Sequence, residues 1–328
     1  MSDRREGGEV MDAEGSGVDP RFVLWLAAHP TRRLKPRSRV EYARRTALFL
    51  TWLDNTAPEY RDALVTPQGR DDAVLAYLTH LKQLGRSPST WNVTLAALNV
   101  YFEFQELGAT QVAPAEIRRV LTRPLTVAEQ SALIAVTENR PSHTRWLRIL
   151  QVRNLAVVMT LLYGGLRESE AEALNDDQVI LTGVRSVLYA PGREVMLSRP
   201  ARFALAAWRA ERAELVGDLR IGAFFLAGDN DGVDCSLRRL SQRQIEDIVR
   251  DLGREAGLRG GEGIGPGVLR ATYAQHVVAA EADTARVAHR LGQVKPDLPQ
   301  INALRATPPI PHPGRTARIE TAQLALDF

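Results

Sequence analysis

The sequence predicts a mainly helical fold in two domains, with one small antiparallel sheet in the second. A length of 328 residues suggests about two domains. Apolar residues recur at helical spacing through most of the chain. Three short runs of β-type residues, separated by turn residues, lie in the second half and predict the sheet.

Composition excludes several classes of protein. Hydrophobic residues make up 45% and charged residues 25%, as in ordinary globular proteins. The longest apolar run, 155–163, is shorter than the roughly 20 residues of a membrane span. We therefore expect no membrane partner and a cytoplasmic protein. The single cysteine, Cys235, cannot form an internal disulfide, and with six scattered histidines it predicts no zinc cluster, so we expect neither metal nor cofactor.

The first domain is expected to be helical. Residues 1–19 are rich in acids and glycine and predict a disordered tail. Asp19 as cap and Pro20 at the first helical position predict a helix start, which opens a domain over 20–112. Its other helical stretches are 38–53, 71–84 and 89–107.

The second domain is expected over 125–303, after a linker at 113–124. Thr126 and Glu129 form a capping-box signature that starts its first helix. A long apolar helix over 147–163 ends at a glycine pair, Gly164 and Gly165. The expected strands and later helices are 178–181, 185–189, 194–197, 200–216, 241–256, 268–280 and 283–291. A proline-rich tail begins at 304 and leads to an amphipathic helix over 316–328.

One segment places an arginine where it can bind an anion. Arg167 directly follows the glycine cap of the long helix and starts the next helical stretch. A guanidinium and nearby backbone N–H groups can converge there on one anion. The segment Leu161–Ala171 resembles the first arginine box of the tyrosine recombinase (phage integrase) family.

The resemblance continues in family order from about residue 20 to 303. The Leu125–Glu129 helix start, the segment Gly265–Ala274 and the Leu291–Gln293 turn resemble the family's helix start, second arginine box and Leu-Gly turn. It implies a helical, SAM-like core-binding domain, a recombinase catalytic-like domain, and double-stranded DNA as partner. Family members attack a DNA phosphate with a tyrosine, and two arginines hold that phosphate. Arg167 and Arg270 match those arginines.

Other positions depart from the family pattern. A lysine and one or two histidines, which handle protons in the family, and the nucleophilic tyrosine are replaced at Leu188, Gly267, Gln293 and Asn302. No tyrosine follows Tyr273 in the chain. From these departures we expect no catalytic residue and a protein that is not an enzyme. The first alternative is a recombinase subunit that uses Tyr273 or works beside an active, paralogous recombinase. The second is a protein-interaction module with solvated arginines.

Arginine supplies nearly all of the 42 basic residues, and arginine suits bidentate phosphate contact. The net charge is only +3 with a pI near 9.2, so the distribution of charge is more informative than its total. Three groups are expected to contact DNA. They are Arg32, Arg33, Lys35, Arg37, Arg39, Arg44 and Arg45; Arg86, Ser89, Thr90 and Asn92; and Arg238, Arg239, Ser241 and Arg243.

The sequence therefore predicts a catalytically inactive, recombinase-like protein that clamps duplex DNA at specific sites. Such a clamp would act in the regulation of transcription, replication, segregation or recombination, and we expect it to be nucleoid-associated. We expect Arg167 and Arg270 still to grip one phosphate; the alternative is capture by Glu168, Glu170 or Glu172 as ion pairs. The helix over 316–328 is too small to fold alone and is expected to mediate self-association on DNA.

Overall fold

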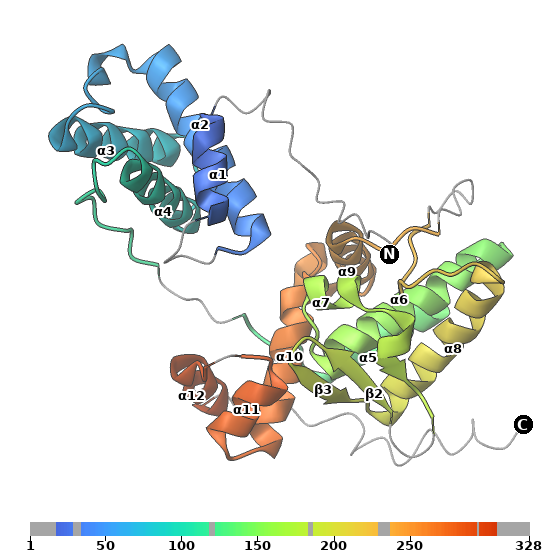
Figure 1. The fold of residues 1–328 in the computed structure, drawn as a ribbon. Coiled ribbons are helices and arrows are strands. Elements are labelled where there is room, and N and C mark those ends of the chain that lie inside the picture. The colour runs from blue at the N-terminus through green and yellow to red at the C-terminus, as the bar shows by residue number, and fades with distance from the viewer. Residues whose placement is uncertain are drawn as a thin grey trace, which may run out of the picture. The chain divides into compact units, whose positions relative to one another are not determined.

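A computed structural model describes residues 18–28, 34–117, 122–182, 186–228, 237–293 and 295–306 (Figure 1). The chain divides into two compact units, residues 1–119 and 120–328, and each is described by itself. The predicted domains 20–112 and 125–303 fall one in each unit. Arg32, Arg33, Cys235 and the predicted helix over 316–328 lie outside the described residues.

All regular secondary structure in the described part of the first unit is helical. Prolines occupy the first positions of its helices, where their missing N–H costs nothing. The Thr66 and Ser87 hydroxyls cap two of them by accepting from the amides of Gly69 and Thr90. The helices are α1 (Pro20–Ala28), α2 (Pro36–Thr56), the short η2 (Pro58–Tyr60), α3 (Pro67–Gln83) and α4 (Pro88–Phe104).

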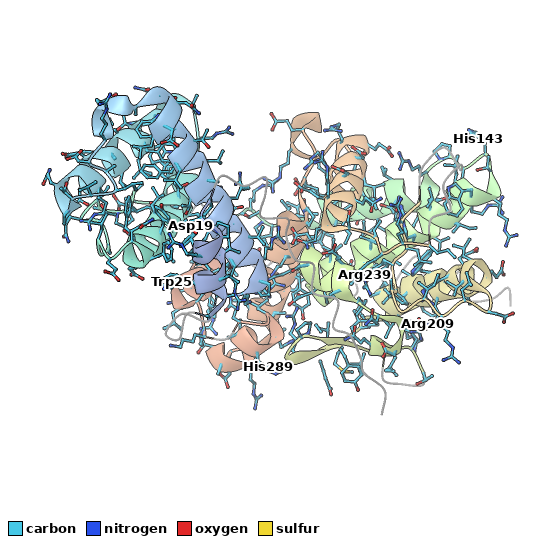
Figure 2. The ribbon with its side chains drawn as sticks, turned by 45° about the horizontal axis from the view of Figure 1, so that its top comes forward. Asp19, Trp25, His143, Arg209, Arg239 and His289 are labelled. Carbon is cyan, nitrogen blue, oxygen red and sulfur yellow. The ribbon has the colours of Figure 1, made fainter. Side chains whose placement is uncertain are left out.

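Aromatic side chains form the core of the first unit. Phe22 of α1 meets Tyr101 of α4 edge to face, with ring centroids 5.1 Å apart. Phe49 of α2 lies 6.0 Å from Phe102 in a similar arrangement. Trp25 is on the same helix as Phe22, and its ring lies 6.2 Å from that of Phe22 (Figure 2). This core fixes α2 and α4 side by side.

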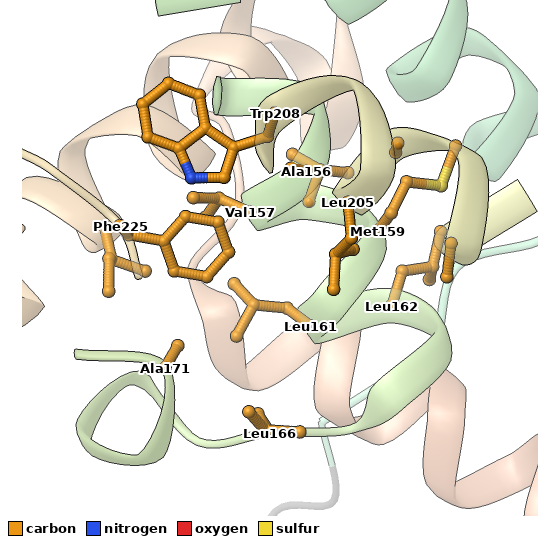
Figure 3. Packing of buried hydrophobic residues seen from close by; sticks show 14 of the residues in the cluster. Ala156, Val157, Met159, Leu161, Leu162, Leu166, Ala171, Leu205, Trp208 and Phe225 are labelled. Atoms are coloured by element: carbon orange, nitrogen blue, oxygen red, sulfur yellow. The ribbon is translucent and has the colours of Figure 1, made fainter. Parts of the chain in front are cut away.

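The second unit is built around one buried helix, α6 (Arg145–Gly164). It packs on α8 (Arg199–Val216), and Figure 3 shows the rings of Trp208 and Phe225 beside Val157 and Leu161. The Trp208 indole N–H donates to the carbonyl of Phe224 at 2.9 Å, so its one polar group is satisfied. The centre of this unit is therefore a buried apolar core around α6.

The remaining helices pack against α6 or against other elements of this unit. The predicted capping box is present, because the Thr126 hydroxyl accepts from the Glu129 amide and the Glu129 carboxylate accepts from the Thr126 amide. These helices are α5 (Val127–Asn139), α7 (Glu168–Ala173), η3 (Asp176–Gln178), α9 (Gln242–Glu255), η4 (Leu258–Gly261), α10 (Pro266–Ala280), α11 (Thr284–Arg290) and α12 (Leu298–Ala306).

The sheet is a three-stranded antiparallel meander of β1 (Val179–Ile180), β2 (Val187–Ala190) and β3 (Arg193–Met196). In its register Leu188 pairs with Val195, and Pro191 and Gly192 make the turn from β2 to β3. The predicted fold class, mainly helical with a small antiparallel sheet, is confirmed.

One helix was not predicted. The sequence analysis expected no element at 298–306, but α12 forms there because Ile301 and Leu304 bury against α10. Among the residues that the structure describes, no helix has the length and apolar character needed to cross a membrane.

Candidate functional site

The end of α6 fixes where Arg167 begins. Gly165 adopts φ +60°, and its amide donates to the Leu161 carbonyl, as in a left-handed helix cap. A side chain at this position would collide with the ring of Tyr273, since a Cβ would come within 2.0 Å of it. The cap therefore lies directly against α10, the helix that carries Arg270.

Glu170 is the point at which the charged groups meet. Its Oε1 accepts from Arg167 at 3.0 Å and from Arg193 of β3 at 2.8 Å. Its Oε2 lies 3.0 Å from Arg193 Nη2 and 3.7 Å from Arg270 Nη1. Three guanidinium groups from three separate elements thus surround one carboxylate, and we call Arg167, Glu170, Arg193 and Arg270 the buried arginine cluster.

Backbone carbonyls complete the cluster. Arg270 donates to the carbonyls of Gly165 and Leu291, and Arg167 Nη2 donates to the carbonyl of Gly292 at 3.3 Å. The turn at 291–292 therefore holds both arginines that the sequence predicted. The expectation that Arg167 and Arg270 converge agrees with this geometry.

The pKa values of Glu170 and Arg270 are both lowered, for different physical reasons. Burial opposes ionisation of Glu170, but hydrogen bonds from Arg193 and from the Arg167 amide outweigh it and hold the pKa of this carboxyl below its ordinary value. Burial, followed by the like charge of Arg167, lowers the pKa of Arg270 to about 10. A cation whose charge is disfavoured in this way would gain from an added anion.

The cluster carries more positive than negative charge. Glu170 does pair with the arginines, as the alternative interpretation expected, but one carboxylate faces three guanidiniums. The side chains of Arg167 and Arg270 are 43% and 20% exposed. The arrangement can therefore accept a solvent-borne anion through planar, charge-assisted hydrogen bonds.

The four positions at which the sequence analysis expected departures from the family pattern have different surroundings. Leu188 is buried in β2, and Asn302 is exposed on α12. Gly267 lies exposed in the first turn of α10, with open space where a Cβ would stand. Gln293 donates to Gln300 at 3.0 Å. Tyr273 is buried, and its ring packs on the Gly165 cap.

In the first unit, two of the predicted DNA-contacting groups meet. A groove of about 540 Å³ is lined by Arg44 and Arg45 of α2, and by Arg86 and Thr90 at the start of α4. We call it the α2–α4 groove. Residues about 40 positions apart in sequence thus share one basic surface.

Glu41 holds the two α2 arginines of this groove. Its carboxylate accepts from Arg44 at 2.8 and 3.0 Å and from Arg45 at 2.6 Å. Hydrogen bonds from Arg44, reinforced by Arg45 and opposed by partial burial, lower the pKa of Glu41 to about 2. Arg45 also donates to the Thr94 hydroxyl at 3.2 Å, so it is fixed more firmly than Arg44.

The other first-unit candidates divide into exposed and internally bound side chains. Lys35, Arg37 and Ser89 are exposed, whereas Arg39 donates to the Leu34 carbonyl at 3.0 Å. The Asn92 amide pairs with the Ala115 backbone in both directions, each at 2.8 Å. Asn92 therefore fastens the segment after α4.

The third predicted group lies at the start of α9. Ser241 caps this helix, and Arg238 and Arg243 are exposed. Arg239, labelled in Figure 2, donates to the Leu174 carbonyl at 3.1 Å and to Asn175 at 2.6 Å. Arg239 thus ties the start of α9 to the segment after α7.

Sequence reasoning missed Arg193. Its signal was present: β3 alternates between buried and exposed side chains, and Arg193 stands with Val195 on the buried face. A charged residue at an inward-facing strand position needs a partner of opposite charge. That partner is Glu170, which the sequence analysis considered only as a competitor for the phosphate arginines.

Comparison with known proteins gives relatives over most of the chain. Tyrosine recombinase XerA of Thermococcus kodakarensis is 26% identical over 236 residues, covering 70% of this chain and 75% of that protein. Tyrosine recombinase XerD of Mycobacterium leprae is 30% identical over 200 residues, 60% of this chain and 61% of that protein. The Tn1549 transposon integrase, solved with transposon right end DNA, shares the fold, with a TM-score of 0.56 at 15% identity and coverage of 93% and 98%.

These relatives correct one expectation. The expectation that the protein is not an enzyme is wrong, because the relatives that it matches are named tyrosine recombinases, which are enzymes. It rested on residue types missing from fixed spacings, as at Gln293 and Asn302. For deciding whether the protein is an enzyme, residue spacing in one sequence is weaker evidence than similarity to recombinases over a whole domain.

The family model agrees with the position of the site. The model described as the phage integrase family matches residues 124–296, more than half of the chain. That range contains all four members of the buried arginine cluster and the turn that holds them. The chain belongs to the phage integrase family.

Proposed function

We propose that this protein binds duplex DNA at specific sites in recombination and holds one backbone phosphate between Arg167 and Arg270. The observation that carries the proposal is the convergence of these two arginines, from α7 and α10, on one partly exposed point. Relatives named tyrosine recombinases support the process.

A phosphate fits the cluster better than the groups that now occupy its donors. Arg167 donates a terminal N–H to the carbonyl of Gly292, and Arg270 donates its terminal N–H groups to the carbonyls of Gly165 and Leu291. All three carbonyls are neutral acceptors. A phosphate oxygen carries charge, and hydrogen bonds to charged acceptors are roughly twice as strong as neutral ones. DNA can therefore displace at least some of these bonds with a net gain.

The α2–α4 groove supplies contacts of another kind. Arg44 and Arg86 are exposed, and Thr90 adds a hydroxyl at the same surface. Such side chains bind backbone phosphates with little dependence on base sequence. The structural neighbour solved with transposon right end DNA supports duplex DNA as the ligand.

The first test measures DNA affinity against salt concentration. Each phosphate contact contributes roughly 1 to the log–log slope. We expect Arg167→Ala and Arg270→Ala each to flatten the slope by roughly 1 on every duplex tested. Arg209→Ala is the control, because Arg209 is tied to Asp176 and Val179 in the same unit and is not expected to touch DNA. Unchanged slopes in both cluster variants would refute the proposed phosphate site.

Two further measurements test site specificity and assembly. Sequencing the genomic DNA that co-purifies with the protein should return a common site, and random fragments would contradict specific binding. Deleting residues 316–328 should abolish cooperative binding while single-site affinity stays nearly intact. Equal cooperativity in the deleted and full chains would contradict self-association through that segment.

A further inference from the structure

Arg193 is the most buried guanidinium of the cluster. Its side chain is 1% exposed, and it follows the Pro191–Gly192 turn at the start of β3. It binds Glu170 with both terminal nitrogens, at 2.8 and 3.0 Å, and donates to the Gly165 carbonyl at 3.2 Å. No solvent-borne ligand can reach a group buried to this degree, so its role must be exerted through its neighbours.

We propose that Arg193 is a positioning residue that neutralises Glu170 and so leaves Arg167 and Arg270 available to the DNA phosphate. This inference rests on the proposed function. Arg193 makes the bidentate contact with Glu170, whereas Arg167 donates one side-chain bond at 3.0 Å and Arg270 stands 3.7 Å away. The side chains of Arg167 and Arg270 therefore make fewer hydrogen bonds with the carboxylate than that of Arg193 does.

Arg193 also supports the turn at 291–292. Gly292 has φ +63°, and a Cβ there would come within 1.8 Å of Arg193 Nη1. The turn thus rests directly on the buried guanidinium. Because Leu291 and Gly292 offer their carbonyls to Arg270 and Arg167, the position of Arg193 sets the position of both donors.

Arg193 also keeps one donor unsatisfied. Its buried Nε has no hydrogen-bond acceptor within the part of the chain that the structure describes. A buried donor without an acceptor costs stability, and a cation placed for stability alone would satisfy it. The unsatisfied Nε of Arg193 therefore supports a role for this residue in binding rather than in stability alone.

The proposal predicts what removing the cation does. In Arg193→Met the side chain keeps much of its volume, but Glu170 loses its bidentate partner and competes with DNA for Arg167 and Arg270. We expect DNA affinity to fall about tenfold or more, the value of a charge-assisted contact. The log–log salt slope should flatten by roughly 1, because one phosphate contact is lost.

A double variant separates neutralisation from simple packing. Arg193→Met combined with Glu170→Gln removes both charges, so the outer arginines regain their freedom, and most of the affinity and slope should return. Arg193→Lys keeps the charge and should retain the slope even if the methionine variant does not fold. Arg153→Met is the matched control: Arg153 is similarly buried, lies on α6 roughly three turns before the Gly165 cap, and binds Asn154 and the Leu226 carbonyl.

The outcomes distinguish the two proposals. If Arg167→Ala and Arg270→Ala flatten the slope but Arg193→Met does not, Arg193 is structural and the positioning role is refuted. The role is also refuted if Arg193→Lys loses the slope, or if the double variant stays as weak as Arg193→Met. If neither Arg167→Ala nor Arg270→Ala changes the slope, the phosphate site itself is absent. Arg153→Met is expected to lower the unfolding temperature and leave the slope unchanged.

Discussion

The two units hold their arginines in opposite ways. In the α2–α4 groove, Arg44 is 53% exposed and pairs with Glu41 on the same helix, within one turn. In the buried arginine cluster, Arg193 is 1% exposed and pairs with Glu170 across 23 residues. One side chain type thus serves as surface charge in the first unit and as part of the tertiary structure in the second.

The difference determines what each group can contribute. Exposed ion pairs gain little energy and are screened by salt, so the groove suits attraction of DNA without fixed geometry. Removing one partner of a buried pair leaves an uncompensated charge and is costly. Under the proposed function, the cluster couples DNA contact to the stability of the fold, whereas the groove does not.

The substitution that should destabilise the protein most lies in the turn that holds the buried arginine cluster. Gly292→Ala places a methyl group against Arg193 in a residue with positive φ. We expect the free energy of unfolding to fall by about 2–5 kcal/mol, the sum of left-handed strain and overpacking. DNA affinity should fall in parallel, because the turn orients both Arg167 and Arg270. Chemical denaturation and DNA titration measure the two effects.

Gly257→Ala is the control for this prediction. Gly257 has φ +66°, nearly that of Gly292, but nothing lies within 4 Å of its Cβ position. It should show the strain alone, about 1–2 kcal/mol, and keep wild-type DNA affinity. Equal losses in both glycine variants would show that the contact with Arg193 is unimportant.

The next effect concerns a residue that the sequence assigned to DNA. Asn92→Ala removes both hydrogen bonds to Ala115, and we expect a loss of about 1–3 kcal/mol in the free energy of unfolding. Ser89→Ala, at an exposed position of the same helix, should change stability very little. If Asn92→Ala unfolds normally but binds DNA less specifically, its amide reads a base edge after all.

Local signals in the sequence were sufficient to predict most of the α-helices. Thr126 with Glu129 predicted the start of α5, and the glycine pair predicted the end of α6 at Gly165. These features act over a few residues, so spacing alone reveals them. The helix α12 was not predicted, because it depends on burying Ile301 and Leu304 against α10.

The site was predictable only in part, for the same reason. Arg167 and Arg270 follow from two local motifs that resemble a family pattern. Arg193 is brought to them by the pairing of β2 with β3 and by the turn at Gly292. The choice between phosphate contact and internal bonding for Asn92 and Arg239 likewise depends on partners distant in the chain.

A smaller effect is expected from a substitution in the α2–α4 groove. Arg44→Gln should flatten the salt slope of DNA binding by up to roughly 1 and change the unfolding temperature little, because Arg44 pairs with the partly exposed carboxylate of Glu41. Arg21→Gln is the control, since Arg21 is also exposed and paired with an acid, Asp19, but lies outside the groove. A drop in stability for Arg44→Gln comparable to that of Asn92→Ala would show that the groove is structural.

The smallest effect is the pH dependence of the groove. The pKa of Glu41 is lowered from 4.5 to about 2, chiefly by hydrogen bonds from Arg44. A carboxyl with a depressed folded pKa contributes stability that is complete above its unfolded pKa and lost as pH falls through the folded one. The contribution should therefore be full above about pH 4.5 and disappear towards pH 2. Because the pair is partly exposed, we expect no more than about 1 kcal/mol. Glu41→Gln should remove this part of the pH dependence when unfolding is measured from pH 5 to pH 2, and an identical profile for the variant and the wild type would contradict the assignment.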